Sequence, residues 1–65
     1  MIIRDLVGYE VWECDKEEAR TLWVSNPDDR WRIWTHEEVD AHMLSDPDTI
    51  LDMIQKKENQ PGEYL

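Results

Sequence analysis

The stretch that decides the fold reads WTHEEV, residues 34–39. Thr35 has a typical helix N-cap side chain, and Glu38 follows three residues later, which together make a capping box. Trp34 precedes the cap and Val39 follows it, at a spacing that allows the two side chains to staple the first turn. These signals predict a helix that begins directly after Thr35.

A second helix is predicted directly downstream. The first helix is expected to run to about Leu44, and the next begins at Ser45-Asp46-Pro47-Asp48, because proline fits the first helical position and acids favour the first turn. The apolar stripe of the second helix consists of Ile50, Leu51, Met53 and Ile54. Lys56 and Lys57 lie near its negative end. Both helices are short, so packing must stabilise them.

The N-terminal half has the composition of strands. Three segments are rich in aromatic and β-branched residues, namely Gly8–Cys14, about Thr21–Ser25, and Arg30–Trp34. The sequence Asn26-Pro27-Asp28-Asp29 favours a turn between the last two segments, which predicts a hairpin. We therefore predict an α+β fold, a three-stranded antiparallel sheet followed by two short helices.

Two segments of this half allow an alternative. Asp15 and Glu18 can form a capping box, and several apolar residues that follow have helical spacing. These apolar residues are Ala19, Leu22 and Trp23. A short helix from Lys16 as far as Trp23 is therefore an alternative to the second strand. Residues 2–7 fit a strand and a helix equally well.

A chain of 65 residues makes one small domain with a thin core. We expect a single compact α+β domain over residues 1–58 and a flexible C-terminal tail over residues 59–65, where Pro61 and Gly62 break any pattern. Cys14 is the single cysteine, which favours a reducing compartment, so we expect a cytoplasmic protein. No run is apolar enough for a membrane span.

The charge balance is strongly acidic, with 16 acids against 7 bases and a formal net charge of −9. Contacts with phosphate need Lys and Arg, so this balance disfavours direct binding to nucleic acid or to an anionic membrane. It favours a basic protein surface as the partner. An acidity that serves only solubility is the alternative.

The tryptophans bear on where a partner binds. Alternation along the predicted strands places Trp12, Trp23 and Trp34 on one face of the sheet. A thin domain needs aromatic residues in its core. A stripe left uncovered would instead mark an interaction surface, so core and interface both remain open.

No motif for catalysis or for a cofactor is present, and we expect neither. Glu38 and His42 have the spacing of helical metal ligands, but two ligands do not make a metal site. Cys14 is predicted to be a small core residue, although a nucleophilic pair with His36 is geometrically conceivable. Trp31 stands between two arginines, which indicates cation–π contact or cross-strand charge pairing.

The candidate partner-binding residues are the clustered acids. They are Asp28, Asp29, Glu37, Glu38, Asp40, Asp46, Asp48 and Asp52. Regularly spaced carboxylates can imitate a phosphate backbone and occupy a site lined with Lys and Arg. The alternative interpretation is a solvated helix face.

In size, acidity and compactness, the whole chain resembles the small acidic inhibitor proteins of phages and mobile elements, of the anti-CRISPR and DNA-mimic type. The resemblance implies a stoichiometric inhibitor that binds the basic site of a host nucleic-acid-binding defence complex.

A second hypothesis is a self-associating module, antitoxin-like or adaptor-like. Such a module would use the tryptophan face as its interface, for example in a homodimer. As a third hypothesis, residues 34–39 with residues 46–50 loosely resemble a helix-turn-helix DNA reader. The acids on the second helix would repel phosphate, so DNA binding is the minor hypothesis.

Overall fold

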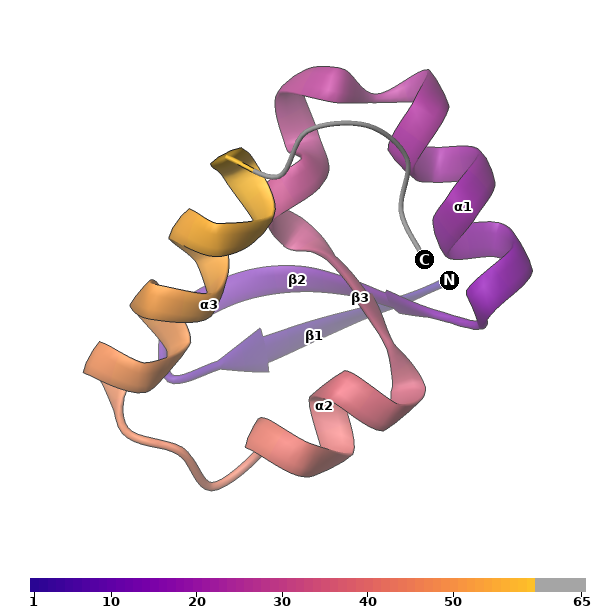
Figure 1. Ribbon diagram of the computed structural model, residues 1–65. Helices are drawn as coiled ribbons and strands as arrows, with labels where there is room; N and C mark the ends of the chain where they lie inside the picture. Colours follow the sequence, from indigo (N-terminus) through magenta and orange to yellow (C-terminus); the bar gives the residue numbers. More distant parts are fainter. Residues whose placement is uncertain (60–65) are drawn as a thin grey trace.

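The computed structural model describes residues 1–59 as a three-stranded sheet with helices packed against both faces (Figure 1). In chain order the elements are β1 (Ile2–Leu6), β2 (Tyr9–Cys14), α1 (Lys16–Ser25), the 3₁₀ helix η1 (Pro27–Arg32), β3 (Ile33–Thr35), α2 (His36–His42) and α3 (Pro47–Asn59). β2 lies in the middle, antiparallel to β1 and parallel to β3. The α+β class is confirmed, whereas the fully antiparallel sheet and the count of two helices are wrong.

The first two strands form a tight hairpin. Residues 2–7, which fitted a strand and a helix equally, provide β1, and the predicted strand from Gly8 begins one residue later. Val7 and Gly8 make the turn with φ of 48° and 93°, the positive values that a two-residue hairpin turn requires. Asp5 Oδ1 accepts a hydrogen bond from the Gly8 backbone at 2.7 Å, which fixes the turn.

The second predicted strand, Thr21–Ser25, is wrong, and the alternative helix is confirmed. Asp15 caps α1 by accepting a hydrogen bond from the Glu18 backbone at 2.8 Å. Ala19 and Trp23, four residues apart, both point into the core from this helix. The β-branched composition of residues 21–25 favoured a strand, but local capping and the burial of one helix face outweigh that preference.

The hairpin predicted at residues 26–29 is therefore also wrong. Asn26 ends α1 by donating its backbone N–H to the Leu22 carbonyl at 2.8 Å, and Pro27 begins η1. Of the predicted strand Arg30–Trp34, only its last two residues belong to β3. Because a helix now connects β2 to β3, the chain returns to the same end of the sheet and the two strands run parallel.

The helical half of the chain follows its predicted signals. The capping box of Thr35 and Glu38 is present, although α2 ends at His42 rather than near Leu44. Pro47 is the first residue of α3, and Asp46 caps it through the Thr49 backbone at 2.8 Å. The tail predicted over residues 59–65 begins at the last residue of α3, and residues 60–65 lie outside the described residues.

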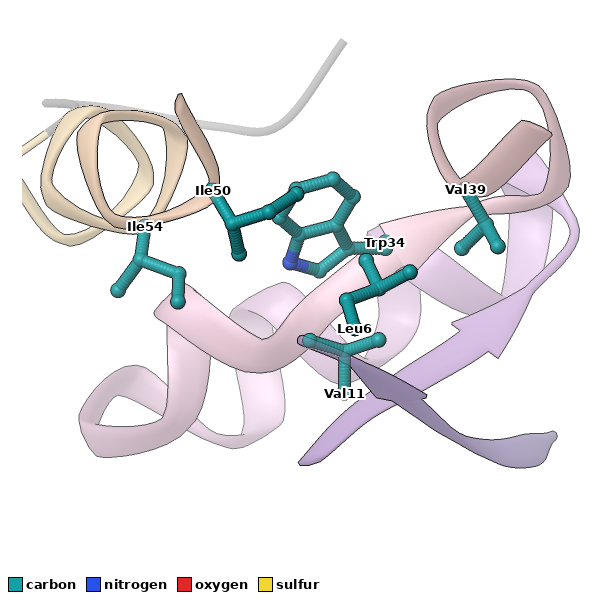
Figure 2. Packing of buried hydrophobic residues seen from close by; sticks show 6 residues of the cluster. All are labelled: Leu6, Val11, Trp34, Val39, Ile50 and Ile54. Atoms are coloured by element: carbon teal, nitrogen blue, oxygen red, sulfur yellow. The ribbon is translucent and has the colours of Figure 1, made fainter. Parts of the chain in front are cut away.

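Two groups of buried side chains form the core, one on each face of the sheet. One joins β1, β2 and β3 to α2 and α3 and consists of Leu6, Val11, Trp34, Val39, Ile50 and Ile54 (Figure 2). The other joins β2 and β3 to α1 and consists of Cys14, Ala19, Trp23 and Ile33. Trp23 and Trp34 are fully buried on opposite faces, so the single tryptophan face predicted from the sequence is wrong.

Candidate functional site

Four of the seven Lys and Arg side chains are partly or fully buried and contact other residues of the protein. They therefore contribute little positive charge to the surface. Two of them are the arginines beside Trp31, and cation–π contact, one of the two kinds of interaction predicted for them, is present. Arg32 lies 4.4 Å from the ring centre of Trp31 and 5.4 Å from that of Trp12. Arg30 lies 5.3 Å from the Trp23 ring and donates from Nε to the Trp23 carbonyl at 3.1 Å. Both arginines are half-buried and hold η1 against the body of the protein.

The third inward base, Lys57 of α3, is almost completely buried. Its Nζ donates to Glu38 Oε2 at 2.7 Å and lies 5.2 Å from the ring centre of Trp34 and 6.0 Å from that of Trp23. Burial lowers the pKa of Lys57, and the Glu38 carboxylate opposes that shift. The ammonium therefore stays inside the protein because a carboxylate and two aromatic faces surround it.

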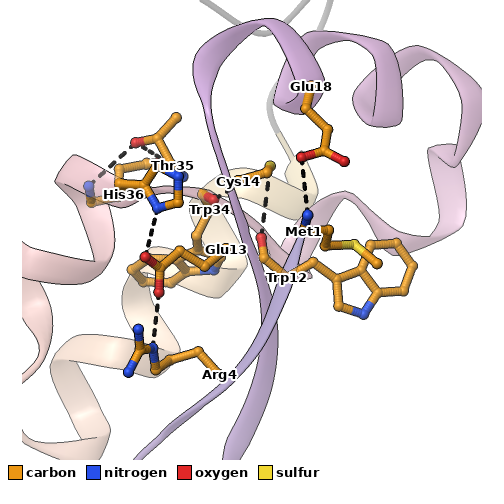
Figure 3. A network of polar contacts seen from close by, with 10 residues as sticks. Met1, Arg4, Trp12, Glu13, Cys14, Glu18, Trp34, Thr35 and His36 are labelled. Atoms are coloured by element: carbon orange, nitrogen blue, oxygen red, sulfur yellow. Dashed lines mark hydrogen bonds and ion pairs between the residues drawn. The ribbon is translucent and has the colours of Figure 1, made fainter.

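The fourth base, Arg4, belongs to a network around the buried Glu13 that sequence reasoning missed (Figure 3). Glu13 of β2 accepts from Arg4 Nε at 2.8 Å through Oε1, and its Oε2 lies 2.6 Å from His36 Nδ1. The hydrogen bond to His36 is the main cause that lowers the pKa of Glu13, with a smaller contribution from Arg4. A charged residue between Trp12 and Cys14, at an inward position of a strand, was the available signal.

The surface that remains has a higher ratio of acids to bases than the sequence as a whole. Within residues 1–59, eleven acids are exposed against three bases, Lys16, Arg20 and Lys56. The exposed acids are Asp5, Glu10, Asp15, Glu17, Asp28, Glu37, Asp40, Asp46, Asp48, Asp52 and Glu58. Residues 33–55 contain no Lys or Arg at all. The helical half of the protein therefore exposes carboxylates and contains no Lys or Arg before Lys56.

Five of the eight predicted site residues lie in this helical half and are exposed. They are Glu37, Asp40, Asp46, Asp48 and Asp52, hereafter the acidic group of α2 and α3. Glu37 and Asp40 share one side of α2, and Asp48 and Asp52 share one side of α3. Asp46 also caps α3, and hydrogen bonds from Thr49 lower its pKa. Asp52 pairs with Lys56 at 3.1 Å.

The other three predicted site residues have different surroundings. Glu38 closes the capping box of α2 and binds Lys57, so it stabilises the fold. Asp28 and Asp29 lie in η1, at the opposite end of the molecule from α2 (Figure 1). Asp29 lies 3.8 Å from Arg32. The structure therefore does not bring the η1 acids together with those of α2.

The residues considered for chemistry have structural contacts instead. Cys14 is buried, its Sγ lies 3.6 Å from the Trp34 carbonyl, and burial is the main cause that raises its pKa to about 11. A thiol in this state is a poor nucleophile at neutral pH. His36 is bonded to Glu13, and His42 packs edge-on against Trp34 at 6.0 Å. Within residues 1–59, no three potential ligands gather as a metal site would require.

No family model matches the chain, and comparison with curated proteins and with solved structures found no match. None of the helices in the described part of the chain is long and apolar enough to cross a membrane. What the protein does therefore has to be inferred from the surface described above.

Proposed function

We propose that this protein is a stoichiometric inhibitor whose acidic group of α2 and α3 occupies a basic nucleic-acid-binding site of another protein. The partner class, a host defence complex that handles nucleic acid, follows from the resemblance to anti-CRISPR and DNA-mimic proteins. One observation carries the proposal. The fold takes up four of its seven bases in internal contacts, while all five members of the acidic group of α2 and α3 are exposed.

The spacing of these acids supports imitation of a phosphate backbone. Glu37 and Asp40 lie about 4.5 Å apart along the axis of α2, and Asp48 and Asp52 about 6 Å apart along α3. Phosphates of one B-DNA strand recur about every 3.4 Å along the helix axis, which is also a spacing of a few ångströms. A groove that binds phosphates through Lys and Arg would bind such carboxylates by the same electrostatic attraction.

Self-association is the second candidate, but it needs a different surface from the one the sequence indicated. Trp23 and Trp34 are fully buried and cannot meet a second copy of the chain in this fold. The exposed apolar residues Ile2 and Ile3 lie on β1, an edge strand of the sheet, and offer an alternative contact. The like charge of two copies opposes it.

The test is affinity capture from a bacterial lysate at about 50 mM and about 200 mM salt, with the bound proteins identified by mass spectrometry. The acidic-group variant carries Glu37→Lys, Asp40→Lys and Asp48→Lys, all at exposed positions. The control variant carries Glu10→Lys, Glu17→Lys and Glu58→Lys, so it has the same net charge, with its changes at exposed positions outside the acidic group.

The proposal expects the unaltered protein and the control variant to capture a basic nucleic-acid-binding protein at the lower salt concentration. Capture should fall steeply at the higher concentration, and the acidic-group variant should capture none. Equal capture by both variants would show that overall charge, rather than this group of acids, binds the partner. A salt-resistant partner, or only further copies of the chain, would favour self-association.

A further inference from the structure

The turn between α2 and α3 presents an apolar side chain that the fold does not use. Leu44 is 97% exposed, and its neighbour Met43 is 47% exposed. A single exposed leucine is ordinary on a protein surface, but here two adjacent apolar residues stand at the tip of a turn. Burying Leu44 in a partner would remove apolar surface from water at no cost to the fold.

The turn that carries Leu44 is held firmly on both sides. The Ser45 backbone donates to the His42 carbonyl at 3.0 Å, and Asp46 caps the first turn of α3. The His42 ring packs against Trp34, which ties the turn to the core. A side chain presented on such a fixed turn loses little conformational freedom when it binds.

The charged residues around Leu44 indicate which kind of partner surface can bind it. Asp40 lies four residues before Leu44, and Asp46 and Asp48 follow it closely, all three exposed. With no Lys or Arg between residues 33 and 55, an acidic or phosphate-bearing partner would be repelled. An apolar centre within an acidic rim fits an apolar or aromatic slot bordered by Lys and Arg.

We propose that Leu44 enters the slot in which a nucleobase stacks, in a protein groove that binds single-stranded nucleic acid. Such grooves combine basic side chains that follow the phosphates with aromatic side chains on which bases stack. Asp40, Asp46 and Asp48 meet the basic side chains, while Leu44 packs on the aromatic face. This assignment rests on the proposed function and narrows its partner to proteins with a groove for single strands, because a groove that holds a duplex needs no slot for an unstacked base.

The probes are two synthetic peptides of equal length and charge, one of alternating Lys and Trp and one of alternating Lys and Ser. Each is titrated calorimetrically into the unaltered protein, into Leu44→Ser, and into the control Val24→Ser, at about 50 mM salt. Val24 is a matched control because it is 66% exposed and lies on α1. Amide chemical shifts of the unaltered protein locate the Lys-Trp peptide without any substitution.

The unaltered protein and Val24→Ser should bind the Lys-Trp peptide about tenfold more tightly than the Lys-Ser peptide. Leu44→Ser should lose that preference and keep its affinity for the Lys-Ser peptide. The shifted amides should fall within residues 40–48.

An unchanged preference in Leu44→Ser, equal binding of both peptides, or shifts outside residues 40–48 would overturn the assignment of Leu44. The proposed function would survive these results, because both peptides would still bind through charge. Absence of binding by either peptide would overturn the proposed function, and this inference with it.

Discussion

At the scale of single residues, the buried ammonium of Lys57 shows how strongly this small fold depends on its charged side chains. The side chain of Lys57 is 5% exposed, whereas that of its partner Glu38 is 26% exposed and can reach water. Removing the two partners therefore has unequal consequences. A buried charge that loses its counter-charge is costly, whereas a well-packed apolar replacement of a buried charge is often neutral.

We predict that Lys57→Met changes the free energy of unfolding by less than about 1 kcal/mol, because methionine fills the space between the two tryptophans. Glu38→Gln should lower it by about 2–4 kcal/mol, because it takes the carboxylate away from a buried ammonium and weakens the capping box. Urea unfolding of both variants measures the difference. Equal losses would show that the Lys57–Glu38 pair acts as an ordinary surface ion pair.

The same residues show what sequence reasoning could resolve about the site. The exposure of the acidic group of α2 and α3 was predictable, because helical spacing places these acids away from the apolar stripe. Of the two structural contacts of Glu38, only one was predictable from the sequence. Its cap with Thr35 is local, but Lys57 lies 19 positions along the chain and reaches it only through tertiary packing.

At the scale of elements, one ambiguous segment decided how much of the sheet was predictable. Asp15 caps residues 16–25 as a helix, whereas Thr21, Trp23 and Val24 favour a strand, and the helix forms because it buries Ala19 and Trp23 together. Assigning a strand there produced the false hairpin at residues 26–29 and the false antiparallel sheet. The helical half had no such conflict between cap, periodicity and composition, and its two helices were predicted to within a few residues.

Glu13 links three elements, since it lies on β2 and contacts Arg4 of β1 and His36 of α2. Its pKa is lowered in the folded protein, so its contribution to stability is complete above the ordinary pKa of a glutamate. That contribution is lost as the pH falls from the ordinary value through the lowered one. The link between these elements should therefore weaken in acid.

We predict that Glu13→Gln lowers the free energy of unfolding by about 1–3 kcal/mol near pH 7, because a buried charged acceptor is lost. The difference from the unaltered protein should shrink as the pH falls below the ordinary pKa of a glutamate and through the lowered pKa of Glu13, because Glu13 itself then becomes protonated. Thermal unfolding of both proteins across this pH range measures the effect. A difference that stays constant with pH would contradict the assignment of the charge to Glu13.

At the scale of the whole molecule, the fold separates its charges. Four bases have contacts inside the protein, and the exposed bases Lys16, Arg20 and Lys56 lie outside the stretch of residues 33–55. The net charge was readable from composition, but this separation was not. It depends on which bases meet an aromatic ring or a carboxylate after folding, as Arg32 meets Trp31.

The central claim is that the acidic group of α2 and α3 occupies the site where a partner protein binds nucleic acid. The most direct measurement is the affinity of the captured partner for a labelled oligonucleotide at increasing concentrations of this protein. The account predicts that the apparent dissociation constant for the oligonucleotide rises linearly with protein concentration from its value without the protein, and that the Glu37→Lys, Asp40→Lys, Asp48→Lys variant has no effect. A ternary complex, in which oligonucleotide and protein bind the partner together with unchanged affinity, would contradict it.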